Sequence, residues 1–409
     1  MLSPYCVLDL ADEKGLLAGK VIADLGADVI KIEPPSGDPS RKLGPFYQDK
    51  ESPENSLYWM AYNTSKRGIT LNLKHPKGRD IFRRLVKKAD FVIESFPPGY
   101  LEKLGIDYPQ FKDASPQAIW ASITPFGRTG PYKDYQASDL ITMAMGGVAF
   151  ITGDEHRPPL RLALNQSYIL AGIHCASACL TALMYRNSTG QGQHIDVSIQ
   201  EAVATTLWSS VPIWEFLNIN EPRMGNKGTY GNFIFMREVW QCKDGYVVRL
   251  PIGGLWGAQD WGGLANWMEE DGVIGSLKGV DWANMDTTNL SQQQVDAWEK
   301  DMARFFLLHT KSELEEGASK RGMKLIGVQT VPDIMSSKHL KARGYWKELK
   351  HPELKRNIAY PGYYFLSNEA KHGPKSKAPH IGEHNKEVYQ EKLGLSAKDL
   401  DNLKREGVI

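Results

Sequence analysis

The stretch that decides the fold is VLDLADEKGLLAGKVIADLGADVIKIE, residues 7–33. It begins with a short apolar run, continues with small and apolar residues at helical spacing over 15–26, and ends with a second apolar run at 29–33. Short apolar runs predict strands, and a 3.6-residue apolar spacing predicts a helix, so the expected order is strand, helix, strand. The glycines of this stretch do not form GxGxxG, so a dinucleotide-binding fingerprint is absent.

The same alternation continues along the first half of the chain. Residues 68–73 (GITLNL), 91–94 (FVIE) and 118–123 (AIWASI) are apolar runs that predict further strands. Between the first two, Pro76 opens a predicted helix that carries its apolar residues on one face. Strands that alternate with helices predict a mainly parallel sheet covered on both faces, which makes the fold class α/β.

The middle of the chain has a different pattern. Residues 138–150 and 168–186 predict helices rich in Ala, Gly and Met. Small residues let helix backbones approach closely, which suits packing in a core or across a subunit interface. A glycine-rich segment, GNKGTYG at 225–231, predicts a flexible loop and a domain boundary. We therefore expect a large domain over residues 1–224, followed by a smaller, Trp-rich domain over residues 225–330.

Composition narrows the functional classes. The 409 residues carry a net charge of +1, which provides no electrostatic footprint for nucleic acid or for an acidic membrane surface. No apolar run approaches the ~20 residues needed to cross a bilayer, and the N-terminus lacks a signal pattern. The four cysteines are scattered without a histidine cluster, so we expect ordinary thiols and no metal. The expectation is a cytoplasmic protein that binds neither nucleic acid nor membrane.

Six groups of residues occur in one order across nearly the whole chain. They are LGADVIKIEP (25–34), NTSKRGITLNLK (63–74), ESFPPG (94–99), SDLITMAMGG (138–147), AG (171–172) with TGQGQHIDVSIQEA (189–202), and APHIGEH (378–384). Each group is weak evidence alone, whereas the ordered set is specific. In this set the chain resembles the family III CoA-transferases, the group that contains formyl-CoA transferase, the carnitine CoA-transferase and α-methylacyl-CoA racemase.

The resemblance implies an architecture. The large domain would be Rossmann-like and built from both ends of the chain, so that residues 331–409 return to the domain of residues 1–224. The smaller domain of residues 225–330 would be inserted between these two parts. Two subunits would thread through each other as an interlocked dimer. The tail itself predicts a capped amphipathic helix that begins at Ser396.

The resemblance also implies where coenzyme A binds. In family members CoA lies along the loop after the first strand, a basic segment near the third strand, and the turn after the fourth. The matching residues are Lys14, Gly15, Leu71, Lys74, Ser95, Phe96, Lys103 and Lys133. Lysines and a helix N-terminus suit the phosphates of CoA, and an aromatic face suits adenine. This chain departs from the family at Pro34, where an arginine is common, and in a first loop that is one residue shorter.

The family's catalytic aspartate has no counterpart here. In the relatives this aspartate attacks the acyl-CoA thioester to give a mixed anhydride, CoA then forms an aspartyl thioester, and the second acid collects the CoA. It lies four residues before the helix glycine and 18 before the helix arginine, and counting back from Gly172 and from Arg186 gives Tyr168 both times. A phenol has a pKa of about 10 and cannot form an anhydride that exchanges to a thioester.

No other acid or base in the sequence stands at a position that would replace the missing aspartate. Asp154 and Glu155 are the nearest acids and lie in a polar segment that predicts a turn. Asp139 matches a family aspartate that is not the nucleophile. The racemase branch carries a histidine just before that aspartate, and Ser138 stands there instead, so racemase chemistry is excluded too. Two histidines fall in helix and strand patterns, where we expect structural roles: His174 and His194.

Three hypotheses remain open for the function. We favour a subunit of a heteromeric family III CoA-transferase that moves CoA from an acyl-CoA, such as succinyl-CoA, to a small carboxylic acid. This chain would be the non-catalytic subunit, inactive alone and paired with a homologous subunit that carries the catalytic Asp. Benzylsuccinate CoA-transferase resembles this arrangement, which favours benzylsuccinate-type acids. The alternatives are a self-sufficient CoA-transferase with a relocated nucleophile and a non-enzymatic acyl-CoA-binding protein.

Overall fold

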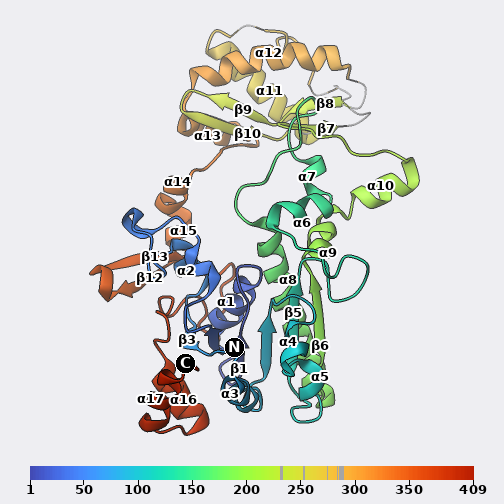
Figure 1. Cartoon of the computed structure of the whole chain (residues 1–409). Coiled ribbons are helices and arrows are strands. Elements are labelled where there is room, and N and C mark those ends of the chain that lie inside the picture. Colours follow the sequence, from blue (N-terminus) through green and yellow to red (C-terminus); the bar gives the residue numbers. More distant parts are fainter. Residues whose placement is uncertain (231–233, 252–253, 274, 283, 285–289) are drawn as a thin grey trace. The chain divides into compact units, whose positions relative to one another are not determined.

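The structure is a computed structural model that describes residues 1–230, 234–251, 254–273, 275–282, 284 and 290–409. The chain forms two compact units, which are described separately below (Figure 1). The first unit combines residues 1–149, 161–219 and 338–409, and the second combines residues 150–160 and 220–337.

A six-stranded sheet organises the first unit. Its strands are β1 (Cys6–Asp9), β2 (Asp28–Glu33), β3 (Arg67–Thr70), β4 (Phe91–Glu94), β5 (Ile119–Thr124) and β6 (His194–Ser198). The strand order is β3-β2-β1-β4-β5-β6, and every neighbouring pair is parallel. This is the strand order of the doubly wound dinucleotide-binding fold, reached here without its glycine fingerprint. The predicted α/β fold with a mainly parallel sheet is confirmed.

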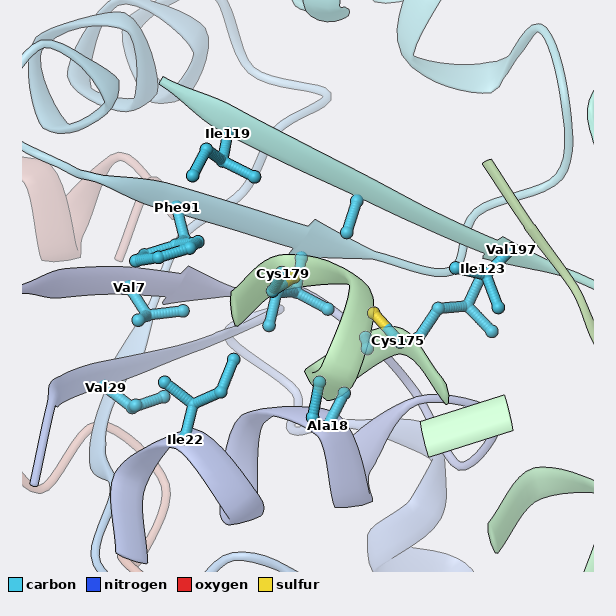
Figure 2. Close-up of a cluster of buried hydrophobic side chains, with 14 of the residues drawn as sticks. Val7, Ala18, Ile22, Val29, Phe91, Ile119, Ile123, Cys175, Cys179 and Val197 are labelled. Carbon is cyan, nitrogen blue, oxygen red and sulfur yellow. The ribbon is translucent and has the colours of Figure 1, made fainter. Parts of the chain in front are cut away.

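Helices α1 (Leu16–Asp24), α8 (Gln166–Thr189) and α9 (Ile199–Ala204) cover one face of the sheet. Figure 2 shows the resulting core, in which Ala18 and Ile22 of α1 and Cys175 and Cys179 of α8 meet the side chains of β1, β2, β4, β5 and β6. The small residues of α1 and α8 allow this close approach, as the composition of the helix predicts. All four cysteines of the chain are buried free thiols.

The opposite face is covered by segments from both ends of the sequence. Helices α3 (Pro76–Val86), α4 (Tyr100–Leu104) and α5 (Tyr108–Phe111) pack there together with α16 (Asn385–Leu393) from the C-terminal region. Buried Trp120 of β5 contacts Phe82 and Phe111 ring to ring, which anchors α3 and α5 on the sheet. Burial on both faces explains why the strands are near-continuous apolar runs in the sequence.

The remaining elements of the first unit lie around this sheet. They are α2 (Leu57–Tyr62), α6 (Asp139–Met145), α10 (Ser210–Leu217), α15 (Lys338–Ala342), α17 (Ala397–Arg405) and the antiparallel hairpin of β12 (Trp346–His351) and β13 (Arg356–Pro361). Helix α17 is capped by Ser396, whose side chain accepts a hydrogen bond from the Asp399 amide, as predicted from the sequence.

The helix predicted over residues 138–150 is interrupted. Helix α6 ends at Met145, and α7 (Val148–Ile151) begins after Gly146 and Gly147. Gly147 has a φ of +89°, a conformation that glycine adopts readily and that stops the helix. Helix α8, by contrast, runs two residues further at its start and three at its end than the predicted 168–186. Its length and composition alone would allow it to cross a membrane, but half of its most apolar window is buried in this unit.

The second unit is a small α/β assembly. It contains a three-stranded antiparallel sheet of β9 (Val239–Cys242), β10 (Gly245–Arg249) and β11 (Leu325–Gly327), and helices α11 (Gly254–Glu270), α12 (Gln292–Leu308), α13 (Lys311–Lys320) and α14 (Val331–Ser336). Its core is rich in tryptophan; Trp261 and Trp282 stack with ring centroids 5.2 Å apart.

The prediction of a loop over residues 225–231 is wrong for most of that segment. Residues Lys227–Tyr230 form β7, which pairs antiparallel with β8 (Ile234–Arg237), and Gly231 lies outside the described residues. Glycine disfavours strands, which is why the sequence predicts a loop. Pairing with β8 and the hydrogen bond from the Tyr230 hydroxyl to Glu238 stabilise the strand nonetheless.

Candidate functional site

The carboxyl ends of the parallel strands create the candidate site. In the strand order β3-β2-β1-β4-β5-β6 the direction of winding reverses between β1 and β4. In open α/β sheets, ligands bind outside the carboxyl ends of the strands at such a point. All eight predicted CoA-binding residues lie in the chain segments that follow β1, β3, β4 and β5.

The loops after β1 and β4 are joined directly. Ser95 follows β4 and is buried; its Oγ accepts a hydrogen bond from the Asp12 amide at 2.8 Å and donates one to Asp12 Oδ1 at 2.7 Å. The Leu10 amide donates to the Ile93 carbonyl oxygen at 2.8 Å. Ser95 therefore fixes the shape of the β1 loop.

Lys14 and Gly15 lie in that loop, immediately before α1. The Lys14 ammonium pairs with the Asp12 carboxylate, and its amide donates to Asp12 Oδ1 at 3.1 Å. A Cβ atom added to Gly15 would lie 2.7 Å from Ile123 Cδ1 and 2.8 Å from Ala11 Cβ, so only glycine fits here. Lys14 is partly neutralised by Asp12, while Gly15 serves the close packing of the loop against β5.

Leu71 and Lys74 follow β3. The Leu71 side chain is buried in the core beside α3, so only its main chain is available at the edge. Lys74 is exposed, and its amide donates to Asn72 Oδ1 at 3.1 Å. Of these two residues, Lys74 offers a charged group to a ligand.

Phe96 and Lys103 follow β4, and Lys133 follows β5. The Phe96 ring is half-buried and stacks on Tyr100 of α4, with centroids 4.8 Å apart and an interplanar angle of 23°. Lys103 is exposed on the same short helix, and Lys133 is exposed in the segment between β5 and α6. Phe96 offers an aromatic platform, and each lysine offers a cation, which are the groups that suit an adenine ring and phosphates.

Tyr168 lies near the start of α8, and only 6% of its surface is exposed. Burial raises the pKa of its hydroxyl above the ordinary value of 10.0, and the charges of Glu13, Asp12 and Asp139 raise it further, while a backbone hydrogen bond from Asp139 lowers it in part. The hydroxyl is therefore neutral at physiological pH. A neutral buried phenol can donate a hydrogen bond but cannot act as the carboxylate nucleophile of the family reaction.

The Asp139 carboxylate is engaged in hydrogen bonds within the fold. Its Oδ1 accepts hydrogen bonds from the amide and the hydroxyl of Ser167, at 2.9 and 2.8 Å. Thr142 Oγ1 donates to Ser167 Oγ at 2.8 Å, which ties α6 to the start of α8. Asp139 therefore positions the segment that carries Tyr168.

The other acids and bases considered from the sequence lie outside the loops that follow β1, β3 and β4. Asp154 and Glu155 belong to the second unit, where the Arg223 guanidinium donates hydrogen bonds to their carbonyl oxygens. His174 lies on α8, and its Nε2 is 3.4 Å from Thr205 Oγ1. His194 Nε2 is 2.9 Å from buried Ser122 Oγ, and burial lowers the pKa of its ring.

The structure adds two acidic residues that sequence reasoning passes over. Glu13 is half-buried in the β1 loop; burial raises its pKa, and the neighbouring Asp12 adds to the rise. Glu94, the last residue of β4, is fully buried and accepts a hydrogen bond from the Phe96 amide at 2.7 Å. Glu94 belongs to the motif ESFPPG, so its presence was visible in the sequence, but its burial was not.

Several motif residues shared with the resembled family form a buried ionic network at the same edge. Lys66 Nζ lies 2.8 Å from Asp9 Oδ2 and donates to the Leu16 carbonyl oxygen and to Asn63. Arg41 binds both carboxylate oxygens of Glu33 and also donates to the Pro379 carbonyl oxygen, at 2.7 to 3.0 Å. These contacts stabilise the edge of the sheet. They give the residues of the motifs NTSK and APH a structural role. Among the described residues, no group of three or more His, Cys, Asp or Glu is arranged to hold a metal ion.

Comparisons with known proteins agree with this architecture. The profile of CoA-transferase family III matches residues 3–385. The chain is 32% identical to succinyl-CoA:(R)-benzylsuccinate CoA-transferase subunit BbsE of Thauera aromatica, over 100% of this chain and 98% of the relative. It is 30% identical to formyl-CoA:oxalate CoA-transferase of Streptomyces avermitilis, over 98% of each chain.

A solved structure is similar as well. The crystal structure of a CAIB/BAIF family protein from Brucella suis superposes with a TM-score of 0.80, at 28% identity, and the match covers 95% of this chain and 98% of that one. Since the family profile and the relatives extend over nearly the whole sequence, the chain belongs to CoA-transferase family III.

Proposed function

We propose that this chain is the non-catalytic subunit of a heteromeric CoA-transferase that moves CoA from succinyl-CoA or a similar acyl-CoA to a carboxylic acid of the benzylsuccinate type. The observation that carries the proposal is Tyr168, a buried and neutral phenol at the position where the family has its aspartate. The remainder of the edge keeps the groups that a CoA-binding chain needs, including Lys74, Phe96, Lys103 and Lys133.

A homologous partner subunit supplies the missing carboxylate in this proposal. That carboxylate attacks the thioester carbonyl and releases the CoA thiolate, and the thiolate then attacks the enzyme's acyl carbon in the resulting anhydride, which gives an enzyme thioester and releases the first acid. The second acid attacks this thioester and releases the CoA thiolate again, and the thiolate attacks the acid's carbonyl in the new anhydride, which frees the partner's carboxylate. The relative BbsE is named as a subunit, and its succinyl-CoA and benzylsuccinate substrates give the proposal its substrate classes. CoA is bound as a substrate and leaves on the second acid.

An exposed apolar face on the first unit supports assembly with such a partner. Trp208 and Phe216, beside and on α10, are 77% and 86% exposed, and Val211, Trp214 and Leu217 of the same helix are exposed as well. On α8, Met184 is 74% exposed. Several large apolar side chains exposed on and beside one short helix often mark a protein interface. We propose that the homologous subunit covers α10 and the outer side of α8 in an interlocked pair.

One observation favours a second candidate, a self-sufficient transferase with a relocated nucleophile. The β1 loop brings Glu13 into the electrostatic environment of Tyr168 and of Tyr58 on α2. Asp12 of the same loop is engaged by Ser95 and Lys14, so Glu13 is the carboxylate that could act there. In this candidate Glu13 attacks the thioester.

Both candidates are separated by one experiment on the isolated chain. Purified protein is incubated with succinyl-CoA, and acyl- or CoA-enzyme adducts are trapped with hydroxylamine and located by mass spectrometry. We expect no adduct from the isolated chain and turnover only after the homologous subunit is added. An adduct on Glu13 that Glu13→Gln removes would replace the first proposal by the second. CoA binding without turnover in either state would leave a non-enzymatic acyl-CoA-binding protein.

A further inference from the structure

We propose that Glu94 is a positioning residue for the nucleotide part of CoA: its buried carboxylate fixes the Ser95–Phe96 turn, so nucleotide binding depends on the charge of Glu94. The inference rests on the proposed CoA site. It adds that protonation of Glu94 weakens the binding of CoA at that site. Glu94 does not touch the ligand in this proposal; it acts through Phe96 and through Arg128.

The contacts of Glu94 reach both sides of the turn. Its Oε2 accepts the Phe96 amide hydrogen at 2.7 Å, which sets the main chain that carries the aromatic platform. Its Oε1 is buried, accepts no hydrogen bond within the described part of the chain, and lies 3.6 Å from Arg128 Nη1. A charged carboxylate strengthens both the amide contact and the attraction for Arg128, and a protonated one weakens both.

Arg128 extends this effect to neighbouring elements. Its guanidinium also pairs with Glu102 on α4, the helix that carries Tyr100 and Lys103, and its amide donates to Asp196 of β6 at 2.8 Å. Tyr100 stacks on Phe96. Glu94 is thus linked, through one arginine and one amide, to the platform and to the helix that carries one of the proposed phosphate-binding lysines.

The groups that face Glu94 decide how it titrates. Ser122 lies opposite on β5 and favours the charged form together with the Phe96 amide and Arg128, whereas Glu102 of α4 disfavours it. His194 of β6 is hydrogen-bonded to Ser122, and Asp196 to the Arg128 amide. Burial is the largest influence and raises the pKa of Glu94 to about 7, so this carboxyl changes charge within the physiological range.

The test compares wild type, Glu94→Gln and the matched control Glu102→Gln, which removes the exposed partner of Arg128 but leaves the Phe96 amide contact in place. Affinity for CoA and for adenosine 3′,5′-bisphosphate is measured by calorimetry between pH 6 and 8. We expect wild type to bind about tenfold more weakly at pH 6 than at pH 8, equivalent to about 1.4 kcal/mol. Glu94→Gln should stay near the weak value throughout, and Glu102→Gln should keep most of the pH dependence.

Hydrogen exchange supplies a readout that does not need a ligand. Peptides that cover residues 95–103 should exchange faster in Glu94→Gln than in wild type at pH 8, with no difference at pH 6. Equal affinities and equal exchange in the two proteins at both pH values would overturn the inference. If Phe96→Ala still weakens CoA binding in that case, the proposed CoA site stands and only the role of Glu94 is rejected.

Discussion

At the scale of single residues, the proposed non-catalytic role rests on Tyr168. A family nucleophile must be a charged carboxylate that the thioester can reach, and Tyr168 is neutral, bulky and almost fully buried. Its neighbours Asp12, Glu13 and Asp139 already place negative charge around it. A replacement carboxylate at this position would be held in its protonated form by burial and by like charges, which is unfavourable for nucleophilic attack.

Tyr168→Asp in the isolated chain should therefore remain inactive. Loss of the buried ring should also lower the free energy of unfolding by about 3–5 kcal/mol, the cost of a large core truncation. Tyr168→Phe, the matched control, should lose about 1 kcal/mol because only a hydroxyl contact is removed. Hydroxylamine trapping and thermal unfolding measure the two quantities. A trapped aspartyl adduct in the Asp variant would show that the surrounding site is still competent.

Because its pKa is raised in the folded state, Glu94 should make the free energy of unfolding fall as pH rises. Its pKa rises from an ordinary value of 4.5 when unfolded to about 7 when folded, so the folded state holds the proton more tightly. The stability from this group is present below about pH 4.5 and is lost as pH rises through 7, a change of roughly 3 kcal/mol. Glu94→Gln removes this titration.

Urea unfolding of wild type and Glu94→Gln at pH 5 and pH 8 checks the prediction. The variant should gain stability relative to wild type between pH 5 and pH 8, by roughly 2–3 kcal/mol. A difference between the two proteins that does not change with pH would mean that Glu94 is charged or neutral equally in both folded and unfolded chains.

At the scale of elements, the apolar strands of the sheet were predictable because burial on both faces requires continuous apolar runs. Strand β7 was not, since Lys227–Tyr230 contains a glycine and gains its pairing from β8. The break between α6 and α7 was missed because the two glycines look like further small residues of one helix.

Part of the candidate site was likewise predictable from the sequence, and part was not. The positions of Lys74, Ser95 and Phe96 after strands follow from the sequence, because carboxyl ends of parallel strands share one edge. The role of Glu94 depends on the packing of β5 and α4 around it, and the nearness of Glu13 to Tyr168 depends on how α1 and α8 meet. Neither is encoded in a local pattern.

The prediction for a single element concerns helix α10. Phe216→Asp places a charge on the exposed apolar face and should abolish association with the homologous subunit, because buried aromatic anchors contribute 2 kcal/mol or more, roughly, to an interface. The fold of the isolated chain should be unchanged, since Phe216 is 86% exposed. Co-purification and circular dichroism measure both. Leu308→Asp, at an exposed apolar residue of the second unit, is the control; equal loss in both variants would refute a specific role for α10.

At the scale of the whole molecule, the carboxyl edge of the sheet should bind CoA largely through exposed cations. Lys74→Glu combined with Lys133→Glu should abolish CoA binding, and wild-type affinity should fall as salt rises, because exposed lysine–phosphate contacts are screened. Calorimetry at low and high salt measures this. Lys88→Glu, at an exposed position beyond the C-terminal end of α3, should bind like wild type. Unchanged affinity in the double variant would mean that the basic residues only solvate the surface.

The central claim is that this chain supports catalysis performed by a partner's aspartate. The most direct measurement is the CoA-transferase rate of the assembled heteromer with two single substitutions made separately: Tyr168→Phe in this chain, and Asp→Ala at the nucleophile position of the partner. We predict that Tyr168→Phe retains most of the rate and that the partner substitution abolishes it. If Tyr168→Phe silences the complex as completely as the partner substitution does, the non-catalytic assignment is contradicted.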